Sequence, residues 1–145
     1  MPQNYQFNFF KTSTILSTTI AKSPKKFHKE VENLNIEIIE SIKNLKGIDI
    51  VKMDLRHLHD APTDFFIICE GTSNTQVRAI ADNINRHVKE TLNLKPNHVE
   101  GEKSSLWICV DYFNTVVHVF HPDMRKYYAL EDLWSDAKTV VYENL

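Results

Sequence analysis

Five consecutive apolar residues at positions 65–69, FFIIC, limit the possible folds of this 145-residue chain more than any other feature. The run is too short for a helix that spans a domain, and Gly71 follows it closely. Side chains of a strand point alternately to the two faces of a sheet, so an all-apolar strand must be covered on both faces. The sequence therefore predicts a sheet with a buried strand at 65–69.

Two segments have the spacing of amphipathic helices. The first carries apolar residues at steps of three and four, and we expect it to begin near Val31 and to end in a left-handed cap at Gly47. The second begins at Ser73, with Gln76 at the spacing of a capping box and Thr72 as an alternative cap, and Pro96 lies just beyond its end. The apolar residues are Val31, Leu34, Ile38, Ile42 and Leu45 in the first, and Val77, Ile80, Ala81, Ile84, Val88 and Leu92 in the second.

The remaining segments complete one domain. Strands are expected at 48–55, at 106–110 and at 115–120 after a turn at Asn114, with HVEG as a short edge strand and a final helix after Pro122. The order is then α-β-β-α-β-β-β-α, an α+β fold with a single mixed β-sheet flanked by helices. We assign residues 1–29 to an N-terminal extension, expected to be mobile, and residues 30–145 to the domain.

The net charge of the chain changes sign at the same boundary, after residue 29. Residues 1–29 contain five lysines and no acid, whereas the remainder holds 12 basic and 19 acidic residues. An acidic domain repels phosphate backbones, so we expect little direct contact with nucleic acid and favour a basic protein partner. The longest apolar run is far below the roughly 20 residues of a membrane helix. The two cysteines form no metal spacing or disulfide framework, which favours a reducing, cytoplasmic location.

The turn GTSN at 71–74 is the first candidate for chemistry. Amide groups at a helix N-terminus attract anions, so a phosphate site is one interpretation, and a simple helix cap is the other. A nucleotidyltransferase would also need clustered carboxylates on a later strand to hold divalent metals. Asp111 stands alone there, with no second acid two residues away. We therefore expect no phosphoryl transfer and no catalytic residue.

Histidines are the second candidate. In a regular strand, His118 and His121 point to opposite faces, which does not form a two-histidine metal site. His98 and Glu100 could converge with either in space, but structural or surface histidines are the simpler interpretation. We expect no metal and no cofactor.

Trp107 is the third candidate. It shares a strand face with Cys109 and Asp111, so that face is not wholly apolar. A tryptophan beside a carboxylate suits a protein-docking surface, and a buried core position is equally compatible with the pattern.

Several blocks, in this order, resemble the ribosomal silencing factor family, also known as RsfS or Iojap. They are KGIDIVKMDL, DFFIICEGTSNTQVRAIAD, HVEG and LWICVDYFNTVVHVFHPDMRKYYALEDLWSDA, and the resemblance as a whole spans about Val31 to Lys138. The resemblance implies a fold related to nucleotidyltransferases without their catalytic acids, and therefore no enzyme. It also implies binding to ribosomal protein L-fourteen of the large subunit, which blocks joining of the subunits and represses translation when nutrients are scarce.

The resemblance further implies a partner-binding site on an exposed sheet face and the final helix. The matching residues are Trp107, Asp111, Tyr112, His118, Phe120, Arg125, Tyr128, Leu133 and Trp134. One departure is Phe113-Asn114, where many members have a Gly-Asp or Gly-Asn turn. Alternatives left open are a large-subunit assembly factor and a degenerate nucleotide binder at Thr72–Asn74. We expect a monomer or weak homodimer, in the cytoplasm, or in an organelle if residues 1–29 are a transit peptide.

Overall fold

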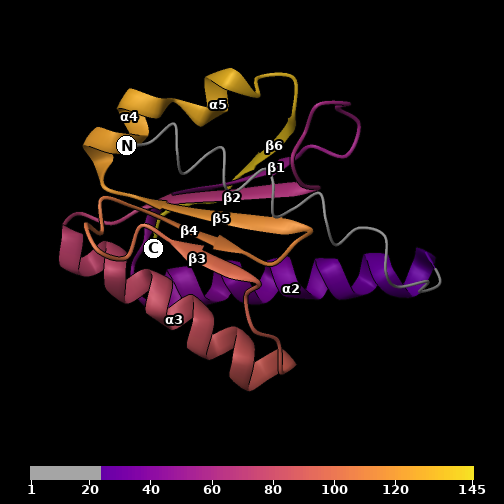
Figure 1. Cartoon of the computed structure of the whole chain (residues 1–145), viewed down its shortest axis with the longest axis horizontal. Coiled ribbons are helices and arrows are strands. Elements are labelled where there is room, and N and C mark those ends of the chain that lie inside the picture. The colour runs from indigo at the N-terminus through magenta and orange to yellow at the C-terminus, as the bar shows by residue number, and fades with distance from the viewer. Residues whose placement is uncertain (1–23) are drawn as a thin grey trace.

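The computed structural model describes residues 24–145, and Figure 1 shows a sheet between two layers of helices. In chain order the elements are α2 (Pro24–Asn44), β1 (Ile48–Asp54), β2 (Phe65–Glu70), α3 (Asn74–Leu92), β3 (His98–Glu100), β4 (Trp107–Asp111), β5 (Thr115–Phe120), α4 (Pro122–Tyr128), α5 (Leu130–Leu133) and β6 (Lys138–Val141). The predicted α+β class is confirmed.

The described strands form one six-stranded sheet in the order β3-β4-β5-β2-β1-β6. Its centre is a parallel pair, β2 and β5, in which Phe65 lies opposite Thr115. Every other neighbouring pair is antiparallel, so the predicted mixed sheet is confirmed. Five of the six residues of β2 are buried, as the FFIIC run predicts for a strand covered on both faces.

Two hydrophobic clusters lie on opposite faces of this sheet. Long helices α2 and α3 cover one face, and the short helices α4 and α5 cover the other (Figure 1). Alternation along β4 divides its side chains, because Ile108 and Val110 pack toward α2 and α3 whereas Trp107 and Cys109 pack into the other cluster. Cys69 belongs to the α2–α3 side, so the two cysteines are buried on opposite faces.

The start of α3 agrees with the predicted cap. The Ser73 hydroxyl accepts a hydrogen bond from the Gln76 N–H at 3.1 Å. The Gln76 side-chain oxygen accepts a hydrogen bond from the Thr72 N–H at 2.6 Å. In a standard capping box, that oxygen would accept from the N–H of the cap residue itself, here Ser73. The Gln76 amide also donates to the carbonyl of Leu45 at 3.2 Å, which ties this turn to the chain just beyond α2.

Helix α2 differs from the prediction at both ends. It begins at Pro24, seven residues before Val31, because a polar, exposed helical turn needs no apolar stripe. The boundary expected after residue 29 therefore falls inside α2, and residues 1–23 of the predicted extension lie outside the described residues. At the other end the left-handed residue is Lys46, not Gly47. Glycine is needed at position 47 for lack of space, since a Cβ there would collide with a methyl carbon of Ile42.

The C-terminal segment also corrects the prediction of one final helix. Ala129 adopts a left-handed conformation (φ 43°) and separates α4 from α5. The chain then adds β6 to the edge of the sheet, where Val141 lies opposite Val51 of β1. Its four residues are all exposed, so no alternation of buried and exposed positions indicated a strand. None of the helices between residues 24 and 145 is long and apolar enough to cross a bilayer.

Candidate partner-binding site

Trp107 and His118 lie at the centre of an aromatic cluster formed by β2, β4, β5 and α4. The Trp107 indole N–H donates to Nδ1 of His118 at 3.1 Å, so the neutral imidazole carries its proton on Nε2. Phe66 meets the His118 ring edge-on, with 4.6 Å between centroids, and Phe120 stacks on Trp107 at 5.0 Å. The ring of Tyr128 also packs against Trp107, with 4.7 Å between centroids.

Burial determines the charge state of this cluster. Trp107 is 8% exposed and His118 is 4% exposed. Burial lowers the pKa of His118 to about 3, so the imidazole is neutral at physiological pH and accepts the indole proton. The pair is thus a rigid, uncharged support beneath Tyr128.

Asp111 is the last residue of β4, and Tyr112 follows it. Asp111 is fully buried, and its carboxylate accepts a hydrogen bond from the Phe113 N–H at 2.7 Å. Burial raises the pKa of Asp111 above the usual range for aspartate, while that hydrogen bond and His98 act against the increase. Tyr112 packs into the other cluster, toward α2 and α3, so it does not share a face with Trp107.

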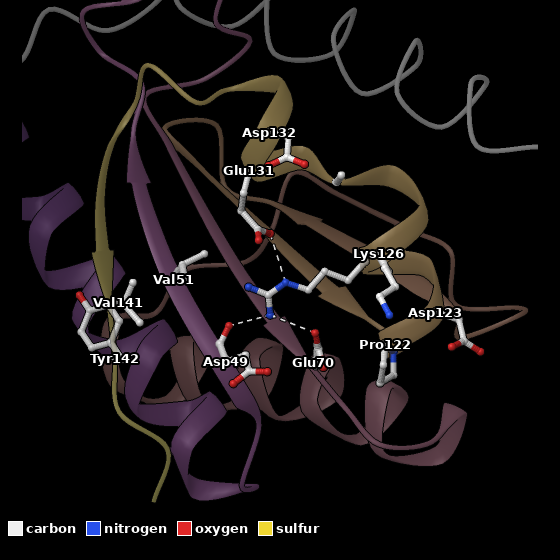
Figure 2. A pocket seen from close by; sticks show the side chains of 12 residues that line it. Asp49, Val51, Glu70, Pro122, Asp123, Lys126, Glu131, Asp132, Val141 and Tyr142 are labelled. Carbon is white, nitrogen blue, oxygen red and sulfur yellow. Dashed lines mark hydrogen bonds and ion pairs between the residues drawn. The ribbon is translucent and has the colours of Figure 1, made fainter.

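Arg125 joins helix α4 to the sheet. Its guanidinium donates to the Asp49 carbonyl at 2.7 Å, to Glu131 at 3.1 Å and to Glu70 at 3.4 Å (Figure 2). The residue is 8% exposed, so removing any one partner would leave a buried charge with less compensation. Arg125 therefore holds α4 and α5 against β1 and β2.

Six of the nine predicted site residues are buried, so the expectation of an exposed face is wrong for them. Met124, Tyr128, Leu130 and Trp134 pack onto the face that holds Trp107 and Phe120, where the Trp107 indole bonds to His118. Tyr112 is buried on the opposite face. The contribution of the six to partner binding stays a prediction. The six are Trp107, Asp111, Tyr112, His118, Phe120 and Arg125.

The α4–α5 layer carries the exposed members of the set. Leu133 is 64% exposed, and Tyr128 and Trp134 are half-buried. Tyr127, which the prediction omitted, is 76% exposed and packs edge-on against Tyr128 with 4.9 Å between centroids. The adjacent Tyr-Tyr pair was visible in the sequence, but only the helix orientation shows which ring faces outward.

A pocket of about 650 Å³ opens beside Arg125, between the β1–β6 edge and α4–α5 (Figure 2). Sequence reasoning missed it, because its carboxylates come from separate segments. Its lining combines charged and apolar side chains: Asp49, Glu70, Asp123, Arg125, Lys126, Glu131 and Asp132 with Val51, Pro122, Ala129, Val141 and Tyr142.

The structure does not bring together the groups of a nucleotidyltransferase site. The turn at 71–74 lies beside the end of β5, where the Gly71 N–H bonds to the Phe120 carbonyl at 3.0 Å. Asp111 pairs with Val116, near the start of β5. The amides of Gly71 and Thr72 are already bonded within the protein. Asp111 and the turn are therefore at opposite ends of the same strand pair.

His118 and His121 have separate structural environments. His121 is the N-cap of α4, where its Nδ1 accepts from the Asp123 N–H at 3.4 Å. His98 is paired with Glu100 on β3. Within residues 24–145, no three potential ligands among His, Cys, Asp and Glu are grouped to hold a metal ion.

Comparisons with known proteins show which family this chain is similar to. The model of the family "Ribosomal silencing factor during starvation" matches residues 28–145. A protein of Halalkalibacterium halodurans named ribosomal silencing factor RsfS is 39% identical over 102 residues, covering 70% of this chain and 77% of that protein. A mouse protein named mitochondrial assembly of ribosomal large subunit protein 1 is 33% identical over 75 residues, covering 50% of this chain and 33% of that protein.

A solved structure is similar over most of the domain. The crystal structure of a Chromobacterium violaceum protein superimposes with a TM-score of 0.67 at 34% identity, covering 72% of this chain and 85% of that chain. The family match, the fold and the order of the sequence blocks agree. This chain belongs to the ribosomal silencing factor family.

Proposed function

We propose that this protein binds ribosomal protein L-fourteen of the large ribosomal subunit and blocks joining of the subunits. Translation is thereby repressed when nutrients are limiting. The protein acts by occupying a surface, in the cytoplasm, without catalysis, metal or cofactor. Family membership supports a ribosome-related role, and the α4–α5 layer supports the binding mode.

The observation that carries the proposal is a set of exposed apolar side chains above a rigid aromatic support. Tyr127 and Leu133 are largely exposed, and Tyr128 rests on the Trp107 ring. Aromatic and aliphatic anchors on a fixed base lose little conformational freedom on binding, which is typical of interface hot spots.

The predicted site residues then act in two layers. Tyr128, Leu133 and Trp134 contact the partner together with Tyr127. The buried residues position them from below: Trp107, His118 and Phe120 through ring packing, and Arg125 through its bonds to the sheet. Asp111 and Tyr112 support the β4 end of the sheet.

Charge complementarity favours this partner. Residues 30–145 have seven more acidic than basic residues, and ribosomal proteins are usually basic. Opposite charges accelerate encounter, and salt weakens this effect.

The experiment is binding of purified L-fourteen by calorimetry, with a subunit-joining assay on sucrose gradients. Leu133→Ala should weaken binding by on the order of 1–2 kcal/mol and restore joining in proportion, because the side chain is an exposed anchor. Leu94→Ala is the matched control, since Leu94 is also exposed but lies beyond the end of α3, in the segment between α3 and β3. Equal binding by both variants and the parent would contradict the proposed surface.

A role in assembly of the large subunit is the second candidate, and the name of the mouse relative favours it. Co-sedimentation separates the two roles. A silencing factor should accompany mature large subunits, with more bound in starved cells, whereas an assembly factor should accompany incomplete particles in growing cells.

Nucleotide binding at Thr72–Asn74 is a third, weaker candidate. Titration with nucleoside triphosphates and magnesium tests it directly. Saturable binding with turnover would support an enzyme and contradict the proposal of a purely occluding protein.

A further inference from the structure

The pocket beside Arg125 has two kinds of wall. Val51, Val141 and Tyr142 line it from the β1–β6 edge, and carboxylates line it from β1, β2, α4 and α5. Figure 2 shows the Glu131 and Asp132 carboxylates on one side of the pocket and those of Asp49 and Glu70 on the other, and Arg125 bonds to groups on both sides. An apolar wall beside carboxylates suits a side chain with an aliphatic stem and a cationic head.

The charges of the lining do not balance. Five carboxylates face two cations, Arg125 and Lys126, which leaves a formal charge of −3. Arg125 is already bonded to the Asp49 carbonyl, Glu70 and Glu131. Among the residues that the structure describes, neither Asp132 nor Lys126 forms an ion pair.

Glu70 is a half-buried carboxylate of this lining. Burial raises its pKa above the usual glutamate range, and Asp49 and Glu131 raise it further, although Arg125 acts against the increase. An additional cation in the pocket would stabilise the ionised form of Glu70.

We propose that this pocket binds a lysine or arginine side chain of the protein partner. The cationic head lies among Glu70, Glu131 and Asp132, and the stem packs along Val51 and Val141. Helices α4 and α5 form one wall of the pocket and also carry Tyr127 and Leu133, so one partner can reach both places. The identity of that partner as L-fourteen rests on the proposed function, whereas the chemistry of the pocket does not.

The first test uses a hexa-arginine peptide and amide NMR shifts of the full chain. The expected result is saturable shifts at residues 49–51, at 70 and along 123–132, with none from hexa-glutamate. The variant Glu70→Gln/Asp132→Asn should weaken peptide binding on the order of fivefold or more, since the pocket loses two carboxylate charges, one of them half-buried. Its control, Glu32→Gln/Glu40→Gln, removes the same charge from exposed positions on α2.

Equal weakening by the two double variants would overturn the proposal, because general charge would then account for binding. So would peptide shifts centred elsewhere. Asp132→Asn alone covers the case in which Glu70→Gln disturbs Arg125 and the fold, since Asp132 is exposed and bonded to no cation.

The second test repeats the series with L-fourteen and separates the two proposals. A parent protein that fails to bind L-fourteen contradicts the proposed function, while the peptide titration still decides the pocket. If the parent binds and Asp132→Asn binds equally at low and high salt, the pocket proposal fails and the proposed function stands.

Discussion

The two faces of the sheet are built differently. The α2–α3 face is covered by helices of 21 and 19 residues, and its buried polar groups bond to one another, as when Asn83 donates to the Ser41 carbonyl at 2.8 Å. The α4–α5 face is covered by helices of seven and four residues and is rich in aromatic and ionisable groups. The first face mainly contributes stability. The second combines support, exposed anchors and a pocket, which is the composition expected of a recognition surface.

Trp107→Ala should give the largest change and affect both properties. We expect the free energy of unfolding to fall by about 3–5 kcal/mol, because a large buried ring is removed. Binding of L-fourteen by the fraction still folded should also weaken, since Tyr128 loses its support. Chemical denaturation and calorimetry on the same sample measure the two effects. Unchanged binding by the folded fraction would assign Trp107 to the core alone.

Ile84→Ala makes the corresponding cavity on the other face. Ile84 is fully buried on α3, so unfolding should become easier by about 2–4 kcal/mol. Binding below the melting temperature should match that of the parent. A loss of affinity comparable to that of Trp107→Ala would remove the distinction between the faces.

His118 should make the α4–α5 face sensitive to acid. Its folded pKa is about 3 and its ordinary value is 6.5, so the unfolded chain binds the extra proton between these values. Stability is then fully present above pH 6.5 and is lost as pH falls toward 3, by roughly 2 kcal/mol between pH 7 and pH 5.

The control for this effect is His118→Asn, which keeps an acceptor for the Trp107 indole and does not titrate. Asp111 and Glu70 have raised pKa values and act in the opposite direction, but they are present in both proteins. The difference between the two pH profiles therefore isolates His118, and parallel profiles would refute its role.

Ala129→Gly should give the smallest effect, a gain of stability. Ala129 is left-handed at the α4–α5 junction, which costs about 1–2 kcal/mol for a residue with a Cβ. Glycine removes that cost but adds about 0.5–1 kcal/mol of unfolded-chain entropy. The net gain should be roughly 0.5 kcal/mol, seen as a small rise in melting temperature. A destabilised variant would show that the junction is not strained.

Local patterns explain what could be predicted from the sequence. The FFIIC run and the Ser73 cap act within a few residues, and both are confirmed. The alternation along β4 correctly placed Trp107 and Cys109 on one face. Strand β6 was missed because it depends on pairing with β1, more than 80 residues earlier in the chain.

The candidate site could be predicted only in part, because it also depends on contacts between segments that are distant in the sequence. A sequence indicates which residues share a face, but not which distant segment covers it. The predicted exposure was therefore wrong for Trp107 and for the residues that pack with it, His118 and Phe120. The pocket was missed because Asp49, Glu70 and Asp132 meet only in the folded chain.

The central parallel pair has a consequence for how the chain folds. Residues that face each other on β2 and β5 are fifty positions apart in the sequence. Strand β4 is hydrogen-bonded to β5 and joins the rest of the sheet through it. Contacts so distant in sequence close slowly, since a long loop must be ordered first. During synthesis, β2 cannot find this neighbour until residue 120 has left the ribosome. The centre of the sheet therefore cannot form until the ribosome has synthesised all of β5, because β2 and β4 both pair with it.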